Sequence, residues 1–277
     1  MPSASVIISV YNRFDYLELV LAGFERQSFK QFEVIIADDG SGDDFVKKLN
    51  NISRSFSFPV VHLRQEDKGF RKNKILNKSI IASTADYLIF IDGDCIPHRE
   101  FVNEHLNHRM KNICFTGRRV NLSDKITLQL SPGLVREGYL EKNNLKLIMD
   151  GLFGQSFYVE KGFFVKNKYL RNILNKKTRG LLGCNFSIYK KDFLRINGFD
   201  ERYEAPSVGE DSDVQYRLEL NGTSIKSLNN IAVQYHLYHK LQERPQKNLD
   251  LFNKVKESGL AFTPFGIEQT SNGLLNG

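Results

Sequence analysis

The sequence predicts an α/β fold with a mostly parallel central sheet and helices on both faces. In the first 120 of the 277 residues, short apolar runs alternate with stretches that carry apolar residues at helical spacing. Such alternation is typical of parallel sheets, whose crossover helices cover both faces. Several of the apolar runs end in acidic or polar residues. In such sheets ligands bind beyond the carboxyl ends of the strands, so we expect a site there.

The elements of the first 120 residues follow from their patterns. Strands are predicted where β-branched and other apolar residues run together, at residues 4–10, 32–37, 59–63 and 87–91. Helices are predicted where apolar residues recur every three or four positions, at residues 15–27, 43–50 and 72–82.

The alternation stops after residue 120. Residues 124–180 are rich in aromatic and basic residues and contain scattered glycines, and they do not continue the strand–helix alternation. Patterning resumes with a strand at 184–189 and a helix at 190–196, followed by a helix at 210–220 and a strand at 231–235. The tail beyond residue 240 is polar, with one helix predicted around 249–257.

The charge balance indicates an anionic partner. The chain has 39 Lys and Arg against 32 Asp and Glu, a net charge of +7. Seven of these cations and no acid lie within 161–180, a segment that we interpret as a solvated surface, a lid over an anionic substrate or a contact with a membrane surface. No recognised nucleic-acid-binding module occurs, so no nucleic-acid partner is expected.

The expected compartment is the cytoplasm. No apolar run of about 18 residues and no secretory signal is present, so any membrane contact is expected to be peripheral, at the inner face. Three cysteines without a CxxC pair fit a reducing compartment and argue against a structural zinc site.

Asp92 and Asp94 follow the predicted strand at 87–91. Two carboxylates separated by Gly93 can face one divalent ion where the backbone leaves strand geometry, and Mg²⁺ or Mn²⁺ prefers such oxygen ligands. Asp and Gly are also ordinary turn formers, but the position among other acidic strand ends favours a metal site. Asp38 and Asp39 end the second strand, where a carboxylate can bind a base or ribose or shape an Asx-type turn.

Two later clusters complete the candidate site. Glu210, Asp211 and Asp213 open a helix, and three acids exceed what capping and the helix dipole require, so one is a candidate general base. His236 and His239 follow the last predicted strand as candidate metal ligands.

A phosphatase is the competing interpretation. The run LIFIDGDCIP approaches the haloacid dehalogenase-like signature, in which Asp92 would be the nucleophile and Asp94 the general acid. Against it, Ile96 replaces the expected Thr or Val, and the run follows the fourth strand rather than the first.

Several motifs in order resemble the family 2 glycosyltransferases, which have the nucleotide-sugar-binding GT-A fold. They are SVIISVYNRFDYLELVLAGFERQSFKQFEVIIADDGSGDD, GFRKNKILNKSIIASTADYLIFIDGDCIPH, GCNFSIYKKDFLRINGFDE and GEDSDVQYRL. The last two are similar to the chondroitin-polymerase and β-1,4-galactosyltransferase-like branch. The resemblance covers residues 1–120 and 183–240 and departs from the family at APSVGED, which replaces an aromatic, glycine-rich loop.

The resemblance implies a role for each matching position. It implies a nucleotide site, a metal site with Asp94 as direct ligand, and a catalytic base at Asp211 with Glu210 positioning a sugar. It implies a metal-completing histidine, for which His236 is favoured over His239. The implied nucleotide-site residues are Ser9, Tyr11, Arg13, Asp39, Arg71 and Asp92.

The implied protein is a metal-dependent, inverting glycosyltransferase. It would use Mn²⁺ or Mg²⁺ and move a hexose or N-acetylhexosamine from a UDP-sugar to a hydroxyl of a glycan or lipid-linked glycan, in bacterial surface polysaccharide or lipopolysaccharide synthesis. The implied organisation is a catalytic domain over 1–240 and a tail over 241–277. Within the domain, 1–120 would bind the nucleotide, 124–180 would form a basic insertion or lid, and 183–240 would supply acceptor and metal groups.

Overall fold

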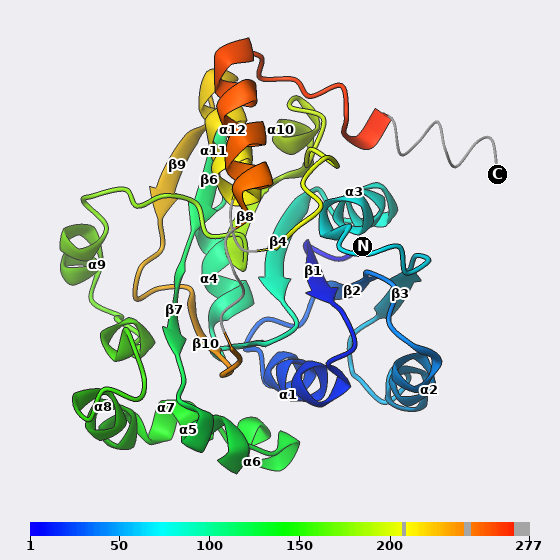
Figure 1. The fold of residues 1–277 in the computed structure, drawn as a ribbon. Coiled ribbons are helices and arrows are strands. Elements are labelled where there is room, and N and C mark those ends of the chain that lie inside the picture. The colour runs from blue at the N-terminus through cyan, green and yellow to red at the C-terminus, as the bar shows by residue number, and fades with distance from the viewer. Residues whose placement is uncertain (207–208, 241–244, 269–277) are drawn as a thin grey trace.

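The computed structural model describes residues 1–206, 209–240 and 245–268. These residues form a seven-stranded sheet with helices on both faces and a separate three-stranded sheet beside it (Figure 1). The predicted α/β class, with a mostly parallel central sheet, is confirmed.

The first half of the chain builds the parallel part of the large sheet. Its strands are β1 (Ala4–Val10), β2 (Phe32–Asp38), β3 (Val60–Arg64) and β4 (Tyr87–Asp92). The helices that follow the first three strands are α1 (Phe14–Glu25), α2 (Asp43–Ile52) and α3 (Lys72–Ala82). All seven elements were predicted, with shifted ends in some cases.

Both faces of this sheet are apolar, which explains the unbroken apolar runs. Val6 and Ile8 of β1 pack on the side of α1, in one core cluster with Leu17 and Phe24. Ile7 points to the other side, in a second core cluster that includes residues of α3. The two clusters place helices on opposite faces.

The second half extends the large sheet with shorter strands. The order is β3-β2-β1-β4-β8-β6-β9, with β8 antiparallel to both neighbours. The added strands are β8 (Asn185–Tyr189), β6 (Ile113–Thr116) and β9 (Ser224–Ser227). The helices that flank them in sequence are α4 (Phe101–His108), α10 (Lys190–Leu194) and α11 (Glu210–Leu220).

The small sheet has the order β5-β10-β7, with β10 antiparallel to β5 and parallel to β7. Its strands are β5 (Cys95–Pro97), β10 (Val233–His236) and β7 (Arg118–Asn121). Only β10 corresponds to a predicted strand. Strands of three or four residues show little periodic pattern, and β5, β6, β7 and β9 were missed. Strand β10 is as short, but it was found through the apolar residues that begin at Ile231.

Residues 124–180 contain short helices, which the sequence pattern did not show. They are α5 (Asp124–Gln129), α6 (Pro132–Arg136), α7 (Tyr139–Lys142), α8 (Asn144–Leu152), the 3₁₀ helix η1 (Val159–Gly162) and α9 (Lys168–Leu174). Elements of four to nine residues are likewise too short for a clear period. In Figure 1, α5, α6, α7 and α8 lie at the bottom of the molecule, and α9 lies above α8 on the left.

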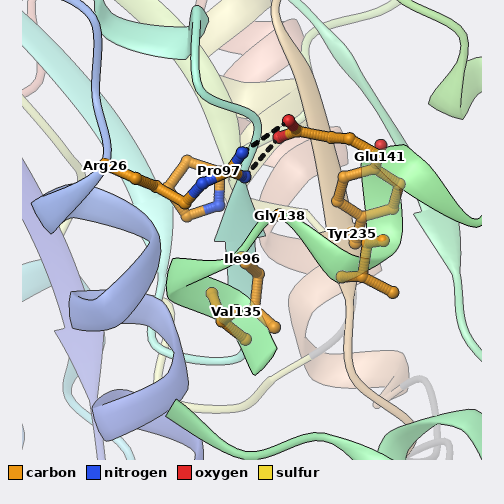
Figure 2. Close-up of a pocket in the computed structure, with 8 residues that line it drawn as sticks. Arg26, Ile96, Pro97, Val135, Gly138, Glu141 and Tyr235 are labelled. Atoms are coloured by element: carbon orange, nitrogen blue, oxygen red, sulfur yellow. Dashed lines mark hydrogen bonds and ion pairs between the residues drawn. The ribbon is translucent and has the colours of Figure 1, made fainter. Parts of the chain in front are cut away.

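An ion pair connects residues 124–180 to helix α1. Arg26 of α1 binds Glu141 of α7 through two hydrogen bonds of 2.6 and 2.7 Å, beside Pro97 and Tyr235 (Figure 2). Two parallel bonds fix orientation better than one. The cavity beside the pair measures about 10 Å³, which is room for one water and not for a sugar.

The tail contains the predicted helix as α12 (Gln246–Ser258), which packs against α11. The predicted tail also includes residues 241–244 and 269–277, which lie outside the described residues. Within the described ranges, no helix is both long and apolar enough to cross a membrane.

Candidate active site

The site begins where β1 and β4 end side by side. Ser9 and Asp92 are register partners, and Ser9 Oγ donates a hydrogen bond of 2.6 Å to Asp92 Oδ1. The chain turns at Gly93, whose N–H donates to the Ser9 carbonyl at 2.8 Å. A Cβ on Gly93 would lie 2.7 Å from Val10 Cγ1, so only glycine fits this turn without a shift of Val10. Two predicted site residues, Ser9 and Asp92, are thus in contact.

Asp94 and both candidate histidines converge at the end of β10. Asp94 Oδ2 lies 3.5 Å from His236 Nε2 and 3.3 Å from His239 Nε2, and the two Nε2 atoms lie 3.1 Å apart. Cys95, Asp94 and His236 also have potential ligand atoms within 4.8 Å of one another. Although burial opposes ionisation of Asp94, its hydrogen bonds to both histidines hold its pKa well below the usual range. A carboxylate and two imidazole nitrogens therefore face one point.

The amino end of α11 brings two further acids to this region. Asp211 Oδ2 accepts a hydrogen bond of 2.8 Å from the N–H of Gly183. A Cβ on Gly183 would lie 2.1 Å from Asp211 Oδ1, so the close approach requires glycine. Burial raises the pKa of Asp211, and burial together with the Asp211 charge raises the pKa of Glu210 to about 7. Glu210 Oε2 is buried and has no hydrogen-bond partner in the described structure.

The third acid of the cluster has a structural contact. Asp213 Oδ2 pairs with Arg217 at 2.5 Å, and both side chains are 1% exposed. Arg217 also donates to the carbonyls of Ile196 and Gly198. Asp213 is therefore part of the buried core, whereas Glu210 and Asp211 face the candidate site.

Lys72 is a site residue that the sequence did not reveal. Its Nζ lies 2.8 Å from Asp92 Oδ1. Burial would lower its pKa, but the charges of Asp92, Glu210 and Asp211 outweigh burial and keep the pKa raised. The one available signal was the position itself, because a lysine in the first turn of a helix opposes the helix dipole.

Arg119 of β7 was also missed. Its Nη1 donates to Cys184 Sγ at 3.3 Å. Its pKa is raised chiefly by Cys184, against burial, with smaller contributions from Cys95 and from the carboxylates of Asp92 and Asp94. The site therefore combines acids with two cations, which the acidic motifs alone did not indicate.

Two predicted nucleotide-site residues, Tyr11 and Asp39, directly follow β1 and β2. Asp39 accepts hydrogen bonds from Gln65 Nε2 at 2.6 Å and from the N–H of Arg71 at 2.7 Å, and burial raises its pKa. Tyr11 is half exposed and donates to Asp67 at 3.0 Å.

The side chains of the two predicted nucleotide-site arginines bind elsewhere. Arg13 pairs with Asp15 and lies over the ring of Tyr16, with Cζ 3.6 Å from its centroid. The Arg71 guanidinium donates to the carbonyl of Glu66. Arg71 thus contacts Asp39 through its backbone N–H. Among the described residues, neither guanidinium group forms a hydrogen bond or ion pair with another predicted site residue.

Asp38 shapes the loop after β2, as the turn interpretation expects. Its Oδ1 accepts from the N–H of Ser41 at 2.8 Å, and its Oδ2 lies 2.9 Å from His62 Nε2. These hydrogen bonds, against the effect of burial, lower the pKa of Asp38. Asp38 is fully buried and Asp39 is 7% exposed, so Asp39 is the more accessible of the two acids at this strand end.

Solved structures show that the fold of this chain is the GT-A fold. The chain is similar to TarS of S. aureus in complex with UDP-GlcNAc, with a TM-score of 0.56 and 16% identity over 94% of this chain and 65% of that one. It is similar to the mannosyltransferase PcManGT of Pyrobaculum calidifontis in complex with GDP-Man and Mn²⁺, with a TM-score of 0.55 and 14% identity over 93% of this chain and 70% of that one.

Residues 5–193 match the family described as glycosyl transferase family 2, and residues 171–240 match the one described as the N-terminal domain of galactosyltransferase. The chain belongs to glycosyl transferase family 2. The predicted family is confirmed. Membership of this family argues against the phosphatase interpretation of Asp92 and Asp94.

Two characterised relatives share this family resemblance. Chondroitin synthase of Escherichia coli is 26% identical over 88% of this chain and 35% of its own length. A GalNAc(5)-diNAcBac-PP-undecaprenol β-1,3-glucosyltransferase of Campylobacter jejuni is 27% identical over 61% of this chain and 54% of its own length. The chain thus spans about a third and about half of these two relatives.

Proposed function

We propose that this glycosyltransferase is metal-dependent and inverting, and that it moves a hexose or N-acetylhexosamine from a UDP-sugar to a hydroxyl of a glycan or lipid-linked glycan. The observation that carries the proposal is the convergence of Asp94, His236 and His239, with Asp92 and Lys72 nearby. UDP-GlcNAc in the TarS complex supports the donor class. The chondroitin and undecaprenol-linked relatives support a glycan or glycolipid acceptor in bacterial surface polysaccharide or lipopolysaccharide synthesis.

The donor atoms fit a divalent cation. Asp94 Oδ2 and the two Nε2 atoms lie within 3.5 Å of one another, so all three can contact one ion after small shifts. Two imidazoles favour Mn²⁺ over Mg²⁺, which prefers oxygen ligands and retained waters. When bound, such an ion supplies positive charge next to a leaving diphosphate. Both histidines contribute in this proposal, whereas the resemblance favoured His236 over His239.

Asp211 is the proposed general base. Its Oδ2 is held by the Gly183 N–H, so the carboxylate is oriented before the acceptor arrives. An acceptor hydroxyl that loses its proton to Asp211 attacks the anomeric carbon from the face opposite the diphosphate, which inverts the configuration. Glu210, with a pKa of about 7 and a free buried oxygen, is suited to share a hydrogen bond with a sugar hydroxyl.

The proposed nucleotide site lies on the other side of Asp92. Asp39 keeps unused lone pairs that can accept from a uracil N–H. Tyr11 is exposed enough to contact the nucleoside. The proposal also includes Ser9, Asp92 and the two arginines, Arg13 and Arg71, whose guanidinium groups would have to leave their present contacts.

The domain division also stays a proposal. Residues 1–120 would bind the nucleotide, 183–240 would supply acceptor and metal groups, and 124–180 would form the basic insertion or lid. The loop APSVGED, at the proposed acceptor side, includes residues 207–208, which lie outside the described residues.

The test is a donor panel with metal. UDP release from UDP-Gal, UDP-GalNAc, UDP-Glc and UDP-GlcNAc is measured with Mn²⁺, with Mg²⁺ and with chelator, and the anomeric configuration of the product is read by NMR. We expect turnover of at least one donor only with metal, and an inverted product. Metal-independent turnover or a retained anomeric configuration would overturn the corresponding part of the proposal.

Metal binding is tested separately by calorimetry. Asp94→Asn and His239→Ala should each weaken Mn²⁺ binding at least tenfold, because the first removes the negative charge of a ligand and the second removes a ligand nitrogen. His108→Ala is the matched control, since His108 lies on α4 and pairs with Glu104. Equal Mn²⁺ affinity in all three variants would contradict the assigned ligands.

A further inference from the structure

Helix α9 presents its polar side chains to the protein and its apolar side chains to solvent. Arg171 donates two hydrogen bonds to Glu104, at 2.7 and 2.9 Å, and one to the carbonyl of Val165. Asn175, one turn later, exchanges hydrogen bonds with the backbone of Asn229 at 2.6 and 3.1 Å. These hydrogen bonds hold the inner face of α9 against the protein, although no apolar side chain of α9 is buried.

The outer face of α9 is apolar. Tyr169 is 73% exposed and Ile173 is 54% exposed, with Leu170 and Leu174 beside them at helical spacing. Helix α9 has no buried residue at all. This is the reverse of a surface helix that packs its apolar stripe on a core.

Helix α8 and the turn after it carry a second apolar face. Leu145, Met149, Leu152 and Phe153 lie at positions i, i+4, i+7 and i+8, and all four are exposed. Leu147 on the opposite side is buried. In Figure 1, α8 and α9 lie on the same side of the molecule. We call the two faces together the α8–α9 surface, which has the eight apolar members Leu145, Met149, Leu152, Phe153, Tyr169, Leu170, Ile173 and Leu174.

Exposed cations lie in and on both sides of α9 in the sequence. Of the seven cations in 161–180, Lys161 pairs with Glu160, and Arg171 pairs with Glu104. The other five are exposed, and no acid lies in this stretch: Lys166, Lys168, Lys176, Lys177 and Arg179. Exposed apolar side chains on a helix with exposed cations before and after it match a bilayer surface that contains anionic lipids, where the apolar groups enter the acyl boundary and the cations meet the headgroups.

The backbone links this part of the chain to the candidate site. Phe157, which is exposed, pairs with Asn121 through two backbone hydrogen bonds of 2.9 Å. Asn121 is in turn the register partner of His236. The segment between α8 and α9 is therefore one strand away from a proposed metal ligand.

We propose that the α8–α9 surface docks on an anionic membrane. The inference goes beyond the transfer reaction and needs only the described surface, so it can hold or fail independently of the proposed metal and base. Reversed polarity of α9 and the flanking cations distinguish this surface from an ordinary solvated basic segment. A lid over an anionic substrate would use the cations but leaves the outward apolar groups without a role.

The experiment measures co-sedimentation of the purified chain with vesicles. Vesicles of phosphatidylcholine alone are compared with vesicles of phosphatidylcholine and phosphatidylglycerol, at low and high salt. We expect binding to the anionic vesicles, weakened by salt. The double variants Leu170→Glu/Ile173→Glu and Lys176→Glu/Lys177→Glu should each lower the bound fraction about tenfold or more.

The matched control places the same charge on exposed apolar residues elsewhere. Met110→Glu/Leu220→Glu changes two side chains that are 54% and 46% exposed and lie outside the surface, and it should bind as the unchanged chain does. UDP release and thermal stability, measured in parallel, should stay equal in all variants. No binding to anionic vesicles, or equal loss in the control, overturns the proposal. Self-association lost in Leu170→Glu/Ile173→Glu, without vesicle binding, assigns the surface to a second copy instead.

Discussion

The acids of α11 allow chemistry and stability to be separated by isosteric substitutions. Asp211→Asn keeps the size of the side chain and an oxygen that can accept from the Gly183 N–H at 2.8 Å, so the fold should persist. It removes the proposed base. Because general-base catalysis contributes about 10²- to 10⁴-fold, turnover should fall by that factor, about 3–5 kcal/mol in the barrier.

Asp213→Asn should have the opposite effect. It leaves Arg217 buried, with its charge no longer neutralised, although the two carbonyls still accept from it. Breaking such a pair costs about 3–5 kcal/mol, and the remaining hydrogen bonds place the expected loss of unfolding free energy near the lower end, at about 3 kcal/mol. Turnover per folded molecule should stay within a few-fold of the unchanged chain.

The assay pairs initial rates of UDP release at saturating donor with urea unfolding and with calorimetric binding of UDP. The expected pattern is lost turnover with kept stability and UDP affinity for Asp211→Asn, and the reverse for Asp213→Asn. Turnover of Asp211→Asn within threefold of the unchanged chain would refute the assignment of the base. An equally stable Asp213→Asn would refute the argument from burial.

Three more variants probe the neighbouring groups. The pKa of Glu210 is about 7 in the folded protein, above its unfolded value, so Glu210 contributes stability at low pH that is lost as pH rises from about 4.5 through 7. In urea titrations with chelator, Glu210→Gln should therefore make the fall in unfolding free energy over this pH range smaller by roughly 1–3 kcal/mol. An unchanged pH profile would contradict this expectation. Gly183→Ala should displace Asp211 and lower UDP release about as much as Asp211→Asn does, whereas Gly180→Ala, whose Cβ would lie 3.3 Å from a flexible Gln215 oxygen, should not. Lys72→Met should cost about 2–4 kcal/mol of unfolding free energy, because it leaves Asp92 without its cation, and equal urea midpoints would argue against the pair.

The buried strands and the longer helices were predictable, because buried elements of this length show continuous apolar runs or apolar residues at helical spacing. The helix at Lys72–Ala82 and the helix at Glu210–Leu220 have the predicted bounds. Strand β7, with the sequence RRVN, was not predictable, since a half-buried four-residue strand has no apolar run. The inverted polarity of α9 was equally invisible, because sequence spacing marks an apolar stripe but not the side it faces.

The candidate site also contains residues that were predictable from the sequence and one that was not. Asp92, Asp94 and the histidines could be singled out because polar residues that follow apolar strands gather at one sheet edge. Lys72 could not, since a lysine at the start of a helix has the pattern of a solvent-exposed residue. Its role depends on Asp92 and on the start of α11, which are distant in sequence and meet only in the fold.

The convergence of Asp94 with two residues of the β10 end also has a consequence for assembly of the protein. The carboxylate and the imidazoles are separated by about 140 residues in the chain, so a shared ion would act as a removable cross-link that closes a very long loop. Since binding free energy of such an ion adds to folding free energy, cellular metal supply would set the lifetime of the folded enzyme as well as its activity. Scarcity of the metal would then first be visible as faster turnover of the protein by proteolysis.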